Sequence, residues 1–217
     1  MNISRTSLRT QVKEILLARI LNGEYKPGDR LIETQIAQEL GTSQAPVRES
    51  LRELATLGFV ESEPYRGTRV RGVTKSELSE IYPVRAALEE VAALTAAHYF
   101  KGNAEALEAE LAAMHQEAEK GNLYEEVLHD VEFHRLIVKA SGNKVLYDVW
   151  KSLRIEARTL ISVVATKIDP HELAERHRPV LEALAAGDGA KAAMLIREHV
   201  EFFGNLILKE DFYDPAG

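Results

Sequence analysis

The chain has 217 residues, no cysteine and a formal net charge of −7 at pH 7. This length favours two domains over one, and the lack of cysteine excludes disulfides and thiolate metal ligands. No segment is long and apolar enough to cross a bilayer, and the opening stretch MNISRTSLRTQVKEILLARI is amphipathic with charges throughout, unlike a secretory signal. We therefore expect a soluble, cytoplasmic protein with no membrane partner.

The charge is divided unevenly along the chain. Residues 1–72 carry 11 lysines and arginines against 9 acidic residues, a net charge of +2. Residues 73–217 carry 16 against 25, a net charge of −9. The difference predicts a mildly basic N-terminal domain joined to an acidic C-terminal domain.

Three short helices and a hairpin are predicted in the N-terminal part. Apolar residues follow helical spacing over 8–21, and the segment NGEYKPGDRL then ends that helix and turns. A second helix is predicted in ETQIAQEL and a third in TSQAPVRESLRELATLGF, whose Thr-Ser pair can cap its start. The segment FVESEPYRGTRVRGV alternates around a turn, as a two-stranded hairpin does. This order predicts a winged helix-turn-helix domain over residues 1–75.

The third predicted helix has an apolar row and an opposite polar row. The apolar row consists of Val47, Leu51 and Leu54, and the polar row, at i, i+4 and i+8, of Gln44, Arg48 and Arg52. Gln and Arg side chains donate to base edges or phosphates when such a helix enters a major groove. The hairpin adds a second basic set, Arg66, Arg69 and Arg71, around Gly67. A glycine at this point lets the backbone approach a minor groove or a phosphate.

These arginines could instead form a solvated face. Their acidic neighbours along the chain are Glu49, Glu53, Glu61 and Glu63, and exposed ion pairs of this kind are common. The complete arrangement of short helices, a capped third helix and a basic wing favours contact with double-stranded operator DNA. Because one short reader helix covers few base pairs, we expect a homodimer that reads a two-fold operator.

The stretch GEYKPGDRLIETQIAQELGTSQAPVRESLRELATLGFVESEPYRGTRV resembles the DNA-binding domain of GntR-family bacterial transcription regulators. Several elements of that domain agree in order and spacing. The resemblance implies that DNA-contacting positions are occupied by Ser43, Gln44, Arg48, Arg66 and Gly67. At the start of the second helix, where some family members carry arginine, this chain has Thr34, which is expected to lie at a DNA-contacting position.

Beyond residue 75 the pattern is helical to the end. Breaks at KGN, KGN, SGN, KIDP and AGDG separate six predicted helices, near 76–100, 103–120, 122–140, 144–166, 170–186 and 188–209. No β-type alternation interrupts them. The fold class expected for the whole chain is therefore mainly α, with an all-α helical bundle over residues 76–217.

Four polar residues stand within apolar rows of these helices. Asp130 and His134 lie one turn apart in a single row, and His177 and His199 lie in the apolar rows of the last two predicted helices. A buried polar group without a partner costs roughly 1–3 kcal/mol. A shared divalent metal ion would satisfy all four side chains together.

A single histidine on an apolar face is more often a core residue bonded to a carbonyl oxygen. Three histidines in register with an aspartate make that interpretation less favourable. The oxygen and nitrogen ligands suit zinc first, with nickel and manganese as alternatives. The other four histidines, His98, His115, His129 and His171, lack this placement and are interpreted as surface or structural residues.

The segments DVEFHRLIVKASGN, ERHRPVLEALAAGD and AMLIREHVEFF resemble the FCD effector domain of the FadR subfamily of GntR regulators. In metal-binding members, this motif places one Asp and three His at the positions of the four residues above. Six C-terminal helices resemble the VanR-type arrangement. The resemblance implies a dimeric regulator whose effector, commonly a small organic acid, coordinates the metal and alters operator affinity.

Arg85, in YPVRAALEEVAAL, lies on an inward-leaning face. A buried arginine requires an anion. One hypothesis is a salt bridge with Glu89 or Asp130, and the other is that Arg85 binds the carboxylate of an effector. FCD relatives carry arginine in the matching motif, which favours an effector-binding role.

Two other functions fit the same residues. A zinc-dependent hydrolase could use one Asp and three His in a helical bundle, but it needs a general base beside the bound water. The nearest acids, Glu132 and Glu198, are adjacent to motif residues and should point away from the inward row. The second alternative is a metal-sensing regulator, in which the metal itself is the signal.

Overall fold

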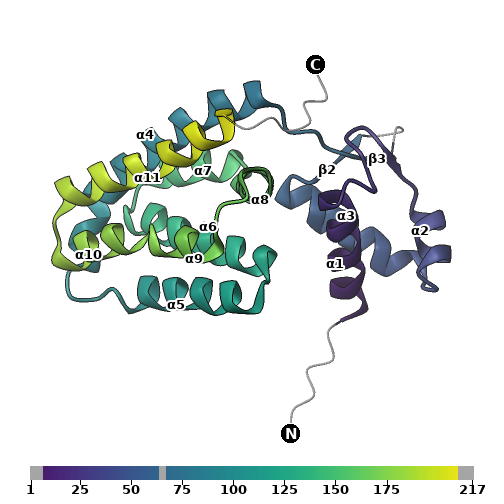
Figure 1. Cartoon of the computed structure of the whole chain (residues 1–217), viewed down its shortest axis with the longest axis horizontal. Helices are drawn as coiled ribbons and strands as arrows, with labels where there is room; N and C mark the ends of the chain where they lie inside the picture. The colour runs from purple at the N-terminus through teal and green to yellow at the C-terminus, as the bar shows by residue number, and fades with distance from the viewer. Residues whose placement is uncertain (1–6, 64–66, 210–217) are drawn as a thin grey trace, which may run out of the picture. The chain divides into compact units, whose positions relative to one another are not determined.

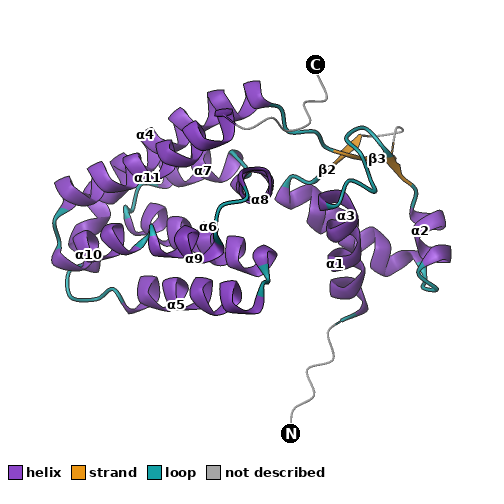
Figure 2. Ribbon diagram, in the orientation of Figure 1, coloured by secondary structure: helices purple, strands orange, loops and turns teal. Residues whose placement is uncertain are grey.

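The computed structural model describes residues 7–63 and 67–209 (Figure 1). The chain divides into two compact units, with the boundary between Val73 and Thr74. Helices predominate, and the strands are confined to the N-terminal unit (Figure 2). Among the described residues, no helix is long and apolar enough to span a membrane. The predicted fold class, mainly α with a winged helix-turn-helix and a helical bundle, is confirmed.

The N-terminal unit has the predicted order of helices, with one additional strand. Its elements are α1 (Leu8–Leu21), β1 (Arg30–Leu31), α2 (Glu33–Glu39), α3 (Gln44–Leu57), β2 (Val60–Glu63) and β3 (Gly67–Val70). The strands form an antiparallel sheet in the order β1-β3-β2. The two-residue strand β1 was not predicted, since two residues are too few to show a β-type alternation.

The apolar row of α3 anchors this helix to its unit. Val47, Leu51 and Leu54 are all buried, and each such side chain contributes about 1.5–3 kcal/mol of hydrophobic free energy. Gly58 ends α3 in the left-handed conformation with φ of 93°, which glycine adopts without a steric penalty. The opposite side of the helix is thereby held toward solvent.

The C-terminal unit contains eight helices between Thr74 and Lys209. They are α4 (Lys75–Phe100), α5 (Glu105–Lys120), α6 (Leu123–Ala140), α7 (Lys144–Ser152), α8 (Ile155–Thr166), α9 (Pro170–Glu175), α10 (Arg178–Ala186) and α11 (Gly189–Lys209). Six helices were predicted in this region. The difference arises because two of the predicted helices, 144–166 and 170–186, are each interrupted.

Both interruptions have a physical cause. Pro179 lies in the first turn of α10, and a proline there cannot continue a preceding helix. Between α7 and α8, Arg154 is left-handed with φ of 47°. The Arg158 guanidinium donates hydrogen bonds to the carbonyl oxygens of Leu153 and Arg154, which satisfies acceptors that the interrupted helix leaves free.

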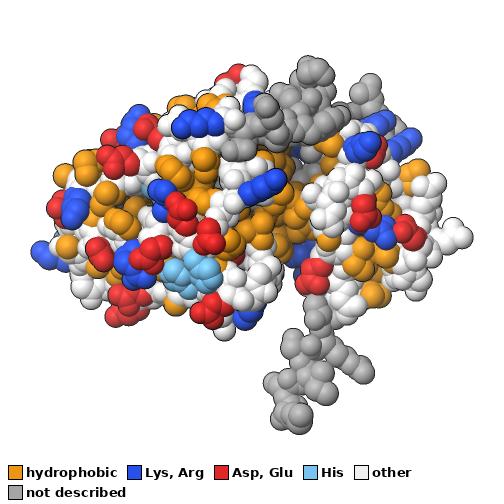
Figure 3. Space-filling view, in the orientation of Figure 1, with side chains coloured by type: hydrophobic (Ala, Val, Ile, Leu, Met, Phe, Trp, Pro, Cys, Tyr) orange, Lys and Arg blue, Asp and Glu red, His pale blue; other side chains and the backbone are white. Residues whose placement is uncertain are grey.

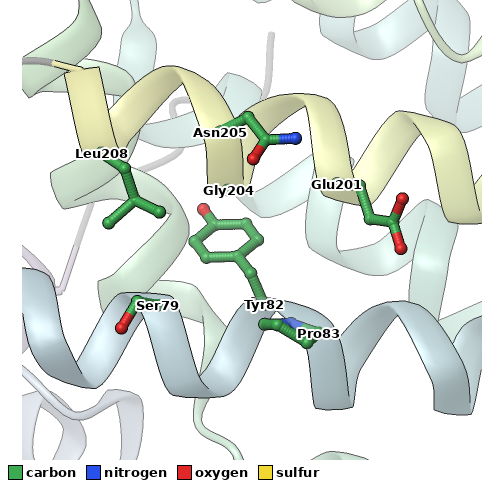
Figure 4. Close-up of a pocket in the computed structure, with 7 residues that line it drawn as sticks. All are labelled: Ser79, Tyr82, Pro83, Glu201, Gly204, Asn205 and Leu208. Carbon is green, nitrogen blue, oxygen red and sulfur yellow. The ribbon is translucent and has the colours of Figure 1, made fainter.

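Helices α4 and α11 run antiparallel in close contact. A Cβ atom at Gly189 would lie 2.4 Å from the Leu94 carbonyl oxygen, and one at Gly204 would lie 2.8 Å from Cβ of Tyr82. Figure 4 shows Gly204 facing the Tyr82 ring, beside a surface pocket of about 280 Å³. The two glycines therefore allow the long helices to approach closely, and α11 carries His199 into the interior of the unit.

Candidate metal centre and nucleic-acid interface

The structure brings the four predicted metal ligands together. Asp130 and His134 lie on α6, His177 precedes the first residue of α10, and His199 lies on α11. All four are buried, and one ligand atom from each lies within 4.8 Å of the others. Residues that span 69 positions of the sequence, from Asp130 to His199, thus form one cluster.

Each of the four side chains has a polar atom without a hydrogen-bond partner among the described residues. These atoms are Asp130 Oδ2, His134 Nε2, His177 Nε2 and His199 Nδ1. His177 Nε2 lies 3.0 Å from Asp130 Oδ1, but the two atoms do not have hydrogen-bond geometry. Because leaving four such groups unsatisfied would cost several kcal/mol, the cluster is suited to a cation.

Two of the histidines are oriented by hydrogen bonds on their other nitrogen. His134 Nδ1 lies 2.6 Å from Oε2 of Glu89. His177 Nδ1 lies 3.1 Å and 3.2 Å from the carbonyl oxygens of Leu173 and Ala174. Since carboxylate and carbonyl oxygens accept hydrogen bonds, each Nδ1 carries the proton and each Nε2 presents a lone pair. Metal-binding histidines are held in this way.

The protonation states also favour metal binding. Burial lowers the pKa of His134, despite the nearby Glu89 carboxylate, and lowers the pKa of His199 well below its usual value. Burial alone would raise the pKa of Asp130, but its interactions with His177, His134 and Arg85 lower it to about 2. Neutral imidazoles and an ionised carboxylate are the forms that coordinate a metal.

The remaining histidines lie outside this cluster. His98 and His171 are exposed, His115 Nε2 lies 3.2 Å from Glu175, and His129 Nδ1 lies 2.7 Å from Glu110. These positions agree with their interpretation as surface or structural residues.

Arg85 is buried beside the metal-ligand cluster, and its guanidinium already has partners. Its Nε donates to Glu89 Oε1 at 2.8 Å, and its Nη1 donates to Thr159 Oγ1 at 3.2 Å. Of the two salt bridges considered from the sequence, the one with Glu89 is present. An effector-binding role for Arg85 therefore requires a ligand that adds to this pair or displaces it.

Glu89 is a functional candidate that the sequence analysis treated only as a partner of Arg85. Its side chain is fully buried and accepts hydrogen bonds from Arg85, His134 and Trp150 Nε1, the last at 2.8 Å. Burial would raise the pKa of Glu89, but Arg85 and His134 lower it far below its usual range. The sequence indicated the pair with Arg85, because Glu89 follows it by four residues. It did not indicate the contact between Glu89 and His134 on α6.

The predicted DNA-binding residues that the structure describes are exposed. They are Thr34, Ser43, Gln44, Arg48, Arg52, Gly67 and Arg69. Arg66 lies outside the described residues. Ser43 immediately precedes α3, but its side chain makes no capping hydrogen bond. Thr34, in the first turn of α2, and the polar row of α3 therefore lie on accessible surface.

Arg48 has an acidic partner that the sequence did not indicate. Its Nε and Nη2 lie 2.9 Å and 2.8 Å from Oε2 of Glu33 on α2. This residue is not among the four neighbours considered for a solvated face. Both side chains are partly exposed, so DNA phosphates can compete with Glu33 for the guanidinium.

Gly67, where a backbone approach to DNA was predicted, is the first residue of β3. Gly67 has φ of 83°, and a Cβ atom there would lie 3.3 Å from Nε of Arg30. Arg69 Nη1 donates to the carbonyl oxygen of Gly28 at 2.8 Å. A side chain at position 67 would therefore be strained by the backbone conformation and crowded by Arg30.

Both units match known protein families. The profile described as "Bacterial regulatory proteins, gntR family" matches residues 2–70, and that of the FCD domain matches residues 80–202. The chain is 38% identical over 198 residues to the "Probable D-xylose utilization operon transcriptional repressor" of Paenarthrobacter nicotinovorans, covering 91% of this chain and 88% of that protein. It is 28% identical over 210 residues to the gluconate operon transcriptional repressor of Bacillus subtilis, covering 92% and 84%.

A solved structure supports the same assignment. The Escherichia coli protein McbR/YncC superposes with a TM-score of 0.66 at 27% identity, covering 93% of this chain and 97% of the other. The matched families and named relatives are transcription regulators rather than enzymes. The alternative of a zinc-dependent hydrolase is therefore wrong.

Proposed function

Because the chain is a ligand-responsive transcription regulator of the GntR family with a C-terminal FCD domain, we propose that it binds a two-fold operator as a homodimer and that a metal-bound organic acid controls its operator affinity. The reader is the exposed row Gln44, Arg48 and Arg52 of α3. The wing residues Arg66, Gly67 and Arg69 contribute phosphate or minor-groove contacts, and Ser43 and Thr34 flank the reader.

The metal proposal rests on one observation, the convergence of four unpartnered ligand atoms in a buried site. Asp130, His134, His177 and His199 would hold one divalent ion, with zinc as the first expectation. The ion would act as a Lewis acid that binds an effector carboxylate. Glu89 orients His134, and Arg85 supplies the nearest buried positive charge.

The effector class follows from this charge and from the relatives. A metal ion and a buried guanidinium both favour an anion. One relative is named for the gluconate operon and another for D-xylose utilization, and gluconate is itself a small organic acid. Carboxylates derived from sugars are therefore the compounds to test first.

The dimer proposal is supported by one face of α4. Val84, Val91 and Leu94 are about half exposed, and Ala87 lies between them. The spacing of three, four and three residues is that of a coiled-coil seam. An antiparallel second copy would place Val84 opposite Leu94 and Ala87 opposite Val91, the self-complementary pairing that a two-fold interface requires.

This face carries no unpaired charge. Between Glu80 and Lys101, the charged residues of α4 are the buried Arg85 and Glu89 and the half-buried Glu90, which pairs with Arg197. Elsewhere, the face of the helical unit visible in Figure 3 has acidic and basic side chains interspersed. The seam on α4 thus differs from that mixed surface and suits association with a second copy.

The metal and effector proposals can be tested together on protein purified without chelator or nickel resin. Elemental analysis should find about one divalent ion per chain, and D-gluconate should change operator affinity in fluorescence anisotropy. His177→Ala should lower metal content and abolish the gluconate response. His129→Ala, outside the cluster, is the matched control and should change neither.

The outcomes also distinguish control by an organic acid from the metal-sensing alternative. A chain that refuses zinc, nickel and manganese would contradict the metal centre. If operator affinity followed free metal concentration and ignored every organic acid, the metal itself would be the signal.

A further inference from the structure

Glu126 is a buried acid that the metal centre does not use. Its side chain is fully buried, and neither carboxylate oxygen has a hydrogen-bond partner among the residues that the structure describes. It precedes Asp130 by one helical turn, and His134 follows by another. The three residues therefore extend one face of α6, and Glu126 continues the row of metal ligands toward the helix N-terminus.

No cation in the described part of the chain pairs with Glu126. Its pKa is raised to about 8, first by burial and then by the negative charges of Asp130 and Asp169. Glu89 provides the contrast, since it is equally buried but accepts three hydrogen bonds. A leucine or a glutamine at position 126 would cost the folded state less free energy than an unpartnered acid does. The fold alone therefore does not account for this carboxyl group.

A ligand at the metal centre would account for it. One turn of helix separates residues 126 and 130, a rise of about 6 Å. A ligand whose carboxylate binds the metal can extend over that distance along α6 if its carbon chain has several atoms. The group it presents to Glu126 must be able to donate and to accept hydrogen bonds, because a protonated carboxyl group does both. Hydroxyl groups meet this requirement without bringing a charge into the interior.

We propose that Glu126 is an effector-recognition residue that exchanges hydrogen bonds with the hydroxyl groups of a polyhydroxylated carboxylate bound at the metal centre. This inference rests on the proposed function and narrows its effector from organic acids in general to hydroxylated acids. Such a site rejects an unsubstituted fatty acid of the same length, because that ligand would leave the buried carboxyl group unpaired.

The test compares D-gluconate with hexanoate, which has the same number of carbon atoms and no hydroxyl groups, on full-length zinc-loaded protein by isothermal titration calorimetry. The wild-type protein should bind gluconate at least about tenfold more tightly than hexanoate. Glu126→Leu should remove that preference by weakening gluconate binding by roughly tenfold or more, while hexanoate affinity stays the same or rises. Glu126→Gln, which keeps an acceptor oxygen, should retain part of the preference.

Zinc content and the melting temperature of the ligand-free variants separate recognition from structure. Glu126→Leu should keep both at the wild-type values or higher, and Glu125→Leu is the matched control on the preceding residue. Loss of zinc in Glu126→Leu would make Glu126 a metal ligand and overturn the proposal. Equal affinity of wild-type protein for gluconate and hexanoate would overturn it as well, even with zinc and an acid response intact. A wild-type chain without zinc would instead contradict the proposed function.

Discussion

The Glu89 carboxylate lies 2.6 Å from Nδ1 of His134, and both side chains are fully or almost fully buried. This contact joins α4 to the metal-ligand row of α6 and holds the His134 proton on Nδ1. Glu89 also binds Arg85 and Trp150. The carboxylate therefore connects a proposed metal ligand to the buried arginine through hydrogen bonds.

Glu89→Gln should lower zinc affinity about 10- to 100-fold, the usual effect of losing a partner that orients a metal-bound histidine. The amide cannot supply the negative charge that makes the imidazole a stronger ligand. Competition with a chromophoric chelator measures this affinity. Glu110→Gln changes the equivalent partner of His129, 2.7 Å away and outside the cluster, and should leave zinc affinity unchanged. Equal zinc affinity in Glu89→Gln and wild type would remove Glu89 from the site.

The cluster was predictable because helical periodicity identifies buried rows. Asp130 and His134 share one row by their spacing alone, and His199 lies in another. Partners contributed by another helix were not predictable in the same way. Glu89 on α4 contacts His134 on α6, and Glu33 on α2 binds Arg48 on α3. No local sequence pattern fixes how these helices pack.

The helix breaks show the same limit. Pro179 is a recognised signal for a helix start, and it could have divided the predicted helix 170–186. The break at Arg154 has no such signal, because arginine rarely adopts a left-handed conformation. Its position depends on Arg158, which bonds the carbonyl oxygens of Leu153 and Arg154.

Metal-free protein should lose stability as the pH falls below about 6.5. The folded-state pKa values of His134 and His199 are lowered, so below the unfolded value of about 6.5 the unfolded chain binds protons that the folded chain does not. Each group alone would then reduce the unfolding free energy by up to about 1.4 kcal/mol per pH unit. Denaturant titrations of chelated protein at several pH values measure this slope, which should be smaller in His199→Gln.

Glu126 should act in the opposite direction. Its folded-state pKa of about 8 lies above the usual value of 4.5. Its contribution to the unfolding free energy is therefore present at low pH and is lost as the pH rises toward 8. Below pH 6.5, its effect on the unfolding free energy partly offsets that of the two histidines. Above pH 6.5, the histidines contribute little to the pH dependence and the effect of Glu126 remains. We therefore expect that wild-type protein loses stability relative to Glu126→Leu between pH 6.5 and 8. Parallel curves over that range would show that Glu126 is ionised in the folded state.

The pair formed by Arg48 and Glu33 allows a matched test of DNA binding. Arg48→Ala should weaken operator binding and leave the melting temperature nearly unchanged, since the pair is partly exposed. If Arg48 contacts a phosphate, the slope of log affinity against log salt should become shallower by roughly 0.9. Glu33→Gln should have the opposite effect on affinity, because it releases the guanidinium from its competing carboxylate. Unchanged affinity in Arg48→Ala would take this residue off the DNA-contacting surface.

The seam on α4 makes a prediction about assembly. Val91 lies in the middle of that seam and is 53% exposed. Val91→Glu would bring a carboxylate from each copy to the centre of an antiparallel two-fold interface, and burying two like charges there opposes association. Analytical ultracentrifugation at micromolar concentration should show a dimer for the wild-type protein and a monomer for the variant. Val145→Glu, on α7 and 74% exposed, is the control and should remain dimeric.

Because Val91→Glu keeps each reader helix but separates the two copies, its affinity for a two-fold operator should fall toward that for a single half-site. A dimeric Val91→Glu protein with normal operator affinity would place the interface on another surface.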